Sequence, residues 1–261
     1  MDNNTKIPKE FQVQPKSEFA KKLDNFWYYH KWKVIAIAFV LVVLAVGIYS
    51  CVTRPKHDVT ILYAGPYSAQ DGSVSKINDA LTSIMPDGLG NDGVAMNVLE
   101  IYSVQQVQSY AEKEVEKYLK ETKEELSEEE KGTLLTNQKN SLTQLTRTNS
   151  ESFSNNLQMG NYVIYFIDPS IYEQYKNLGV FAKLSDVFGD ELPESAYSDD
   201  AISLSKTNFY KSFSGSIGQL PEDTLLCLRI EPIISSGCGK NSTNVEYEKA
   251  VEMFIRIVNY K

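Results

Sequence analysis

The stretch 58-DVTILYAGP-66 decides the fold class that this sequence predicts. Residues 58–64 form an apolar run with the length of a buried strand, and the Gly-Pro pair at 65–66 ends it. The next segment, 73–85, places apolar residues at the spacing of an amphipathic helix. A buried strand followed directly by such a helix is the first unit of an α/β fold.

The alternation of strand and helix continues as far as residue 188. An apolar run at 94–102 precedes a helical pattern that begins near Val104, and the run at 162–167 precedes a helix that Asp168 begins. Three strand–helix units predict a mostly parallel sheet with helices on both faces, forming one lobe. The remaining expected elements are a short extended piece at 180–184, strands at 201–204 and 224–230, and a closing helix at 247–258.

The region 121–148 reads as a helical insertion that projects from this lobe. Ser127 and Glu130 have the spacing of a capping box, which predicts the start of a helix. The helix has only a thin apolar stripe, and a separate short helix is expected at 153–160. We interpret the insertion as an arm that contacts a protein partner; the simpler interpretation is a solvated helical hairpin.

A membrane span precedes the lobe. Residues 34–52, VIAIAFVLVVLAVGIYSCV, contain no charged residue, and a helix of this length covers about 30 Å, the thickness of a bilayer core. Aromatic residues, including Trp27 and Trp32, flank the N-terminal side of the span. Residues 1–33 carry seven lysines against four acids. This bias predicts a single-pass protein of the cell membrane with a cytoplasmic N-terminus and an extracellular C-terminal domain.

Four segments follow from these boundaries. We expect a basic and aromatic cytoplasmic leader at 1–33, a transmembrane helix at 34–52, a linker at 53–57 and an extracytoplasmic α/β domain at 58–261. A cleaved signal peptide would have a much shorter charged leader. Acylation of Cys51 stays open as an alternative anchor.

Charge and cysteine content exclude some functions. The net charge is −8 while the leader is basic, so the outer domain is acidic, which disfavours nucleic acid as a partner. Cys227 lies in an apolar run and Cys238 in a Gly-rich loop, and an oxidising exterior would allow these two to form a disulfide. No cysteine or histidine cluster predicts a metal site, and no cofactor is expected. The Asp- and Gly-rich loop 87–93 lacks the ligand spacing of an EF-hand.

The run 153–188, FSNNLQMGNYVIYFIDPSIYEQYKNLGVFAKLSDVF, carries a resemblance to a known family. Its helix ending in Met159-Gly160, its strand ending at Asp168, and its Gly179-Val180-Phe181 and Leu184-Ser185-Asp186 segments resemble one lobe of the extracytoplasmic, type 2 periplasmic-like solute-binding proteins. The leader 26-FWYYHKWK-33 and the span after it look like those of uncharacterised membrane proteins of Gram-positive bacteria. This resemblance implies a lobe that binds a solute.

Candidate ligand-binding residues lie where the predicted strands end. Parallel sheets bind ligands beyond the carboxyl ends of their strands, and Tyr63, Gly65, Tyr102 and Asp168 come at those ends. Arg229, late in the strand 224–230, could face a ligand carboxylate. The simpler interpretation is that Gly65 turns the chain, Asp168 caps a helix and Arg229 pairs with a neighbouring acid.

An enzymatic alternative rests on three short motifs. Ser73-x-x-Lys76, Ser154-x-Asn156 and Lys206-Thr207-Asn208 follow the order found in penicillin-recognising serine enzymes, in which a lysine one helical turn away activates the serine. Asn208 stands where that pattern has glycine. The only histidines, at 30 and 57, flank the span, so a histidine-based triad in the domain is excluded.

The sequence therefore favours a non-enzymatic, membrane-anchored extracytoplasmic domain that binds a small solute or an envelope protein. The alternatives are a serine hydrolase that acts on the cell wall through Ser73 and Lys76, and a structural subunit of an envelope complex.

Overall fold

The computed structural model describes residues 18–52, 57–68, 72–85, 93–122, 126–231 and 240–261. The chain divides into two compact units, residues 1–55 and 56–261. The first unit contains helix α1 (Glu18–Val52), which begins well before the predicted start at residue 34. Its segment Phe26–Gly47 is the one described helix that is long and apolar enough to cross a membrane. None of that segment is buried within the protein. The sequence-based prediction of an apolar helix of membrane-spanning length is confirmed.

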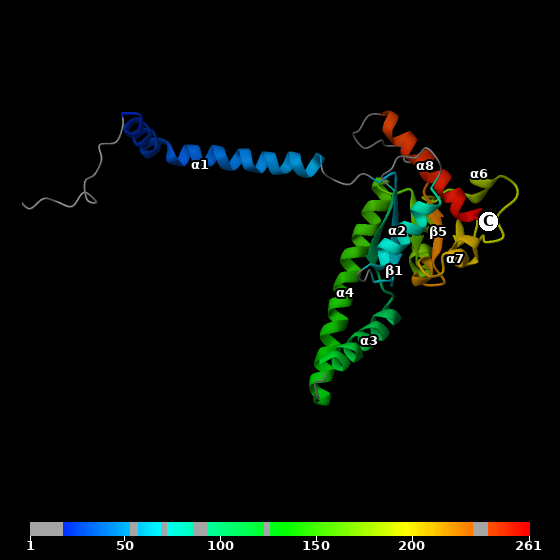
Figure 1. Cartoon of the computed structure of the whole chain (residues 1–261). Coiled ribbons are helices and arrows are strands. Elements are labelled where there is room, and N and C mark those ends of the chain that lie inside the picture. The colour runs from blue at the N-terminus through cyan, green and yellow to red at the C-terminus, as the bar shows by residue number, and fades with distance from the viewer. Residues whose placement is uncertain (1–17, 53–56, 69–71, 86–92, 123–125, 232–239) are drawn as a thin grey trace, which may run out of the picture. The chain divides into compact units, whose positions relative to one another are not determined.

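The second unit is built on a five-stranded sheet with the order β2-β1-β3-β5-β4. Two of these strands, β1 and β5, are labelled in Figure 1. β1 (Val59–Gly65) pairs in parallel with β2 (Val94–Glu100) and β3 (Ile164–Ile167). β5 (Leu225–Leu228) runs antiparallel to both β3 and β4 (Ala201–Ser203). Four strands therefore point one way and β5 alone points the other, which confirms a mixed α/β class with a mostly parallel sheet.

The helices connect these strands in the predicted order. β1 leads to α2 and β2 to the α3–α4 pair, while β3 leads to α5. The bounds of the helices are α2 Ser73–Ser83, α3 Val104–Thr122, α4 Glu128–Met159, α5 Pro169–Tyr175, α6 Leu184–Phe188, α7 Asn208–Ser212 and α8 Lys240–Val258, and those of the short 3-10 turns are η2 Lys176–Leu178, η3 Leu204–Lys206 and η4 Ile217–Gln219.

The buried side chains form two main clusters that share β1. Ile61 and Tyr63 belong to one cluster, together with side chains from α2 and α8. Leu62 and Ala64 belong to the other, together with side chains from α4 and α5. Because successive residues of a strand point to opposite faces, the two clusters lie on either side of the sheet.

Helices α3 and α4 form an antiparallel hairpin, and the prediction of a separate helix at 153–160 needs correction here. α4 is one continuous helix, so the predicted 153–160 helix is its C-terminal end. The apolar stripe that looked thin at its start continues into Phe153 and Leu157, which are buried against the sheet. The helix ends at Gly160, whose φ of 71° is left-handed and suits glycine. The predicted capping box at Ser127 and Glu130 is confirmed, with both reciprocal hydrogen bonds formed.

The region after α5 also departs from the expectation. Only Phe181 of the predicted extended piece makes a strand-like bridge, which it shares with Arg229, and α6 begins at Leu184. The chain then returns through β4 and η3 before β5 enters the sheet between β3 and β4.

Candidate functional site

The carboxyl ends of β1, β2 and β3 meet at one edge of the sheet, as the sequence predicted. The carbonyl of Gly65 accepts a hydrogen bond from the amide of Ile101 at 2.9 Å, and the carbonyl of Ala64 accepts one from the amide of Asp168 at 2.8 Å. Since β5 is antiparallel, its first residue, Leu225, pairs with Ile167 at this same edge. These two hydrogen bonds join the end of β1 to the residues that follow β2 and β3.

Asp168 is a helix cap at this edge. Its carboxylate accepts hydrogen bonds from the backbone amide of Ser170 at 2.8 Å and from the hydroxyl of the same residue. Its exposed fraction is only 5%. The capping interpretation of Asp168 therefore accounts for the side-chain hydrogen bonds that its carboxylate accepts within the described residues.

Tyr63 and Gly65 are packed against each other. Tyr63 is fully buried, and its hydroxyl has no hydrogen-bond partner of acceptable geometry among the described residues. Burial, and next the negative charge of Asp168, hold the pKa of Tyr63 well above its ordinary value. Asp223, just before β5, lies close enough to add to this effect. Sequence reasoning missed Asp223 because the antiparallel direction of β5 was not predicted.

Tyr102 lies just beyond the carboxyl end of β2. Its hydroxyl donates to the carboxylate of Glu100 at 3.1 Å, and the Ser68 hydroxyl donates to the same carboxylate at 3.0 Å. Its ring packs against that of Tyr110 with centroids 4.9 Å apart. Burial, and next the charge of Glu100, raise the pKa of Tyr102. With Tyr102 5% exposed, the predicted ligand edge is occupied by the protein's own side chains.

Arg229 does not join these residues. Leu228 pairs with Ile164, the first residue of β3. Arg229 therefore lies beyond the amino-terminal ends of the parallel strands, opposite to their carboxyl ends. Its guanidinium donates to the carbonyls of Leu157 at 2.9 Å and Gln158 at 3.4 Å, at the C-terminal end of α4. A cation there complements the partial negative charge of the helix end.

The three motifs of the enzymatic alternative are distributed over both sides of the sheet. Ser73 is the first residue of α2, whose N-cap is Gly72, and Lys76 is exposed one turn later. The buried residues of α2 belong to the cluster on one side of β1, whereas Phe153, next to Ser154, belongs to the cluster on the other side. The structure therefore provides no common site for Ser73 and Ser154.

The disulfide between Cys227 and Cys238 stays a prediction from the sequence. Cys227 is fully buried in β5, where burial raises the pKa of its thiol, so it behaves as an inert core residue. Cys238 and nearly all of the loop 87–93 lie outside the described residues. Within the described part of the chain, no group of three or more His, Cys, Asp or Glu side chains could hold a metal ion.

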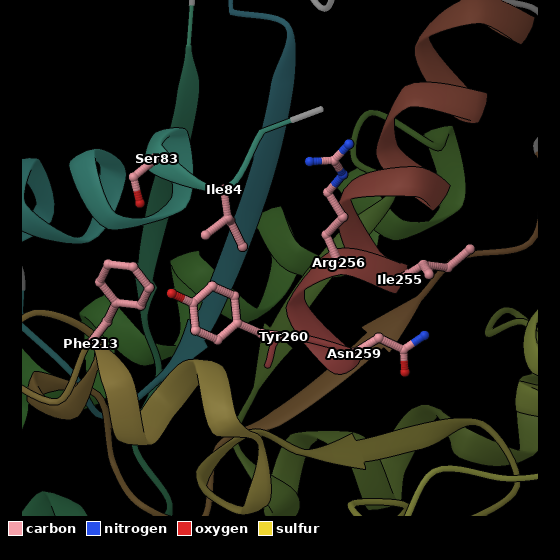
Figure 2. A pocket seen from close by; sticks show the side chains of 7 residues that line it. All are labelled: Ser83, Ile84, Phe213, Ile255, Arg256, Asn259 and Tyr260. Carbon is pink, nitrogen blue, oxygen red and sulfur yellow. The ribbon is translucent and has the colours of Figure 1, made fainter. Parts of the chain in front are cut away.

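One surface pocket lies where the end of α2 meets the end of α8 (Figure 2). It has a volume of about 400 Å³, and in this view the ring of Tyr260 lies beside that of Phe213 and below Ile84. The cation beside it, Arg256, already binds the carbonyl of Met85 and the carboxylate of Glu252, each at 3.4 Å. The pocket is thus an apolar hollow whose charged group is engaged.

A second pocket, of about 430 Å³, is lined by residues from the segments 172–183 and 198–200. We call it the Asp200 pocket. Its walls carry both acids and lysines above a pair of buried aromatic rings. Sequence reasoning missed it because Tyr172 on one wall and Asp200 on the other lie 28 residues apart and no motif links the two walls.

Comparisons of the chain with protein-family models, with curated proteins and with solved structures give no match. The resemblance to solute-binding proteins therefore stays a prediction from the sequence. The observations on the described residues define an α/β domain accompanied by one helix that could cross a membrane.

Proposed function

We propose that this chain is a single-pass membrane protein whose α/β domain is a non-enzymatic docking module, and that the tip of its helical hairpin binds a basic surface of another envelope protein. We define the arm tip as residues 116–137, the outer part of α3 and α4 together with the residues that connect them. The reach of this hairpin beyond the sheet is the observation that carries the proposal.

The hairpin leaves the sheet close to Thr146. The Thr146 hydroxyl accepts a hydrogen bond from the amide of Tyr102 at 3.2 Å, and the Asn149 amide group donates to the carbonyl of Glu100 at 2.9 Å. Residues 128–145 of α4 lie beyond these contacts and span about 27 Å at 1.5 Å per residue. Figure 1 shows α3 and α4 extending together past the end of the sheet.

The core of the hairpin is too small to explain this length. Its buried side chains, Tyr102, Ala111 and Leu142, cluster at the base, where α3 and α4 adjoin the sheet. Toward the tip, α4 is held by its capping box and by local ion pairs such as Lys131 to Glu128 at 2.8 Å. An extension that buries so little apolar surface contributes little to folding, which supports a role in contact.

The charge of the tip indicates the chemistry of the partner. Residues 121–130 contain six glutamates and one lysine. Glu128, Glu129 and Glu130 are exposed at the start of α4. An acidic, exposed tip is complementary to a surface rich in lysine and arginine, and such pairing accelerates association in a salt-dependent way.

The closed strand edge favours this proposal over solute capture at that edge. None of the three side chains at this edge, Tyr63, Tyr102 and Asp168, is more than 5% exposed. The hydroxyl of Tyr102 and the carboxylate of Asp168 already form hydrogen bonds with neighbouring residues. The separation of Ser73 from Ser154 likewise gives the serine-hydrolase alternative no support.

The finer topology belongs to the same proposal. The lysine bias of residues 1–33 supports a cytoplasmic N-terminus and an extracellular domain. The two core clusters support a sheet covered by helices on both faces. Together they describe a membrane-tethered lobe that carries its arm outside the cytoplasm.

Photo-crosslinking in native membranes tests the proposal. A photoreactive benzoylphenylalanine replaces Glu129 in the full chain, and a control chain carries it at Lys211, which is exposed on α7. We expect one discrete protein adduct from position 129, weakened by added salt and lost when Glu121→Lys is introduced. An equal set of adducts from positions 129 and 211, or an adduct indifferent to salt and to Glu121→Lys, would contradict the proposal.

A further inference from the structure

The Asp200 pocket has the size and construction of a small-molecule site. Its volume of about 430 Å³ lies within the range of ligand pockets in proteins. One wall is the segment from Tyr172 to Lys183, and the other is the turn 198–200 that precedes β4. The pocket lies away from the strand edge at which the sequence placed a ligand.

The floor of the pocket is rigid and apolar. The rings of Tyr172 and Phe181 are stacked with centroids 6.2 Å apart and an interplanar angle of 28°. Their exposed fractions are 2% and 4%, and both belong to the buried cluster that contains Cys227. Only the edges of the two rings therefore reach the pocket, and they do not have to be ordered on binding.

An oriented carboxylate stands beside this floor. One oxygen of Asp200, Oδ1, accepts hydrogen bonds from the Ser198 hydroxyl at 2.9 Å and from the Tyr172 hydroxyl. The turn itself is fixed by the amide of Tyr197, which donates to the carbonyl of Ala201 at 2.8 Å. Both side-chain donors use Oδ1, so Oδ2 makes no hydrogen bond within the described residues. Asp200 is thus held in place with one acceptor oxygen to spare.

Two lysines supply the opposite charge. Lys183 is exposed on the wall and forms no ion pair within the described residues, and the amide of Leu184 after it donates to the carbonyl of Asp199 at 2.7 Å. That bond fixes the backbone of the lysine wall beside the acidic turn. Lys176 also lines the pocket and pairs with Glu173 at 2.6 Å. Lys183 is therefore the cation available to a ligand.

We propose that the Asp200 pocket binds a zwitterion, namely an α-amino acid with an apolar side chain. The ammonium group binds the carboxylate of Asp200, the carboxylate binds Lys183, and the side chain contacts the exposed edges of Tyr172 and Phe181. A ligand with one charge of each sign satisfies both walls, whereas a simple amine or a simple acid leaves one charged wall unpaired. This site is independent of the arm.

Titration calorimetry of the full chain in detergent micelles tests the site with L-leucine as the probe. Isocaproate and isoamylamine, which each lack one charged group of leucine, serve as matched ligands. We expect leucine to bind and each of these analogues to bind about tenfold more weakly or worse. Equal affinities for all three compounds, or no heat with leucine up to about 10 mM, would overturn the proposal.

Variants separate the pocket from non-specific binding. Asp200→Asn keeps an oxygen that can accept from Tyr172 and Ser198 but removes the charge, and Lys183→Gln alters only an exposed side chain. We expect each to weaken leucine binding at least about tenfold. The control Asp190→Asn, at an exposed acid outside the pocket, should leave binding unchanged. Circular dichroism confirms that each variant is folded, and unchanged leucine affinity in folded Asp200→Asn would refute the assignment.

Discussion

The hydroxyl of Tyr63 lies directly over the α-carbon of Gly65. A Cβ atom added at position 65 would lie 2.5 Å from that phenolic oxygen and 3.1 Å from the Cβ of Asp168. Atoms cannot approach this closely without displacement, and Tyr63 is held in the core with no room to yield. Glycine is therefore needed at 65 by close packing.

Replacing Gly65 by alanine should destabilise the domain. We expect Gly65→Ala to lower the free energy of unfolding by about 1–3 kcal/mol, the usual cost of overpacking a core. Urea unfolding of the full chain in detergent, followed by circular dichroism, measures the loss. The matched control is Gly132→Ala in α4, where a Cβ meets nothing within 4 Å and should stabilise the helix by about 1 kcal/mol.

Tyr63→Phe should rescue Gly65→Ala. It removes the oxygen that the new Cβ meets, and it also removes a buried hydroxyl that lacks a partner of acceptable geometry. We expect Tyr63→Phe alone to be neutral or mildly stabilising. The double variant should regain part of the lost stability, because Cζ of residue 63 at 3.0 Å and Cβ of Asp168 at 3.1 Å still crowd the new methyl group. Additive losses in the double-mutant cycle would show that the contact between these two residues is not the cause.

Arg229→Met should destabilise the domain through α4 and not through a ligand. The change keeps much of the apolar length of the side chain but leaves the carbonyls of Leu157 and Gln158 without their charged donor. We expect a loss of about 2–3 kcal/mol, since hydrogen bonds to charged groups are among the stronger ones. Hydrogen exchange should show fraying of the last turn of α4. Unchanged protection there would contradict the capping role.

Asp168→Ala should cost about 1 kcal/mol, the typical effect of losing a helix N-cap. Asp168→Asn should cost much less, because the amide oxygen can still accept from the Ser170 backbone. Comparing the two unfolding free energies checks this directly. Equal losses for both variants would show that the negative charge of Asp168, not its acceptor, is what the fold requires.

Alkaline solution should unfold the domain. Burial, the largest cause in each case, raises the pKa of Tyr63, Tyr102, Tyr165 and Tyr172 above the ordinary value of 10.0. A raised pKa in the folded state stabilises the fold below the pKa of the unfolded chain, and that stability is lost as the pH rises above 10.0. Tyrosinate absorbance and circular dichroism should therefore change together.

Tyr165→Phe provides the control for this pH effect. The Tyr165 hydroxyl is buried with no partner of acceptable geometry in the described residues, so removing it deletes one titrating group without breaking a hydrogen bond. The alkaline transition should shift to higher pH. Titration of every tyrosine near pH 10.0 in a chain that stays folded would refute the prediction.

The sequence predicted the fold best where its signals were local. Apolar runs predicted both ends of β1, β2 and β3 to within two residues. The Ser127–Glu130 capping box predicted the start of α4. The continuity of α4 was missed because its exposed half has almost no apolar periodicity.

The candidate sites depended on contacts that no local pattern encodes. Because β5 runs antiparallel to β3, Arg229 lies far from the carboxyl ends of the parallel strands, whereas Asp223 lies close to Tyr63 at those ends. The Tyr172–Asp200 hydrogen bond joins residues 28 positions apart, so the pocket that they form has no sequence signature. Side-chain burial at the strand edge was also beyond prediction, because turn residues and ligand residues have the same types.

The most direct measurement compares the mass of the full chain, gently extracted from its native membranes, with that of a variant lacking the arm tip. Replacing residues 116–137 by a short glycine-rich turn keeps Ala111 and Leu142 at the base of the hairpin. We predict that the full chain migrates as a discrete complex larger than the chain alone, and that the shortened chain, folded by circular dichroism, loses it. An unchanged complex in the shortened chain, or a full chain that migrates alone, would contradict docking through the arm tip.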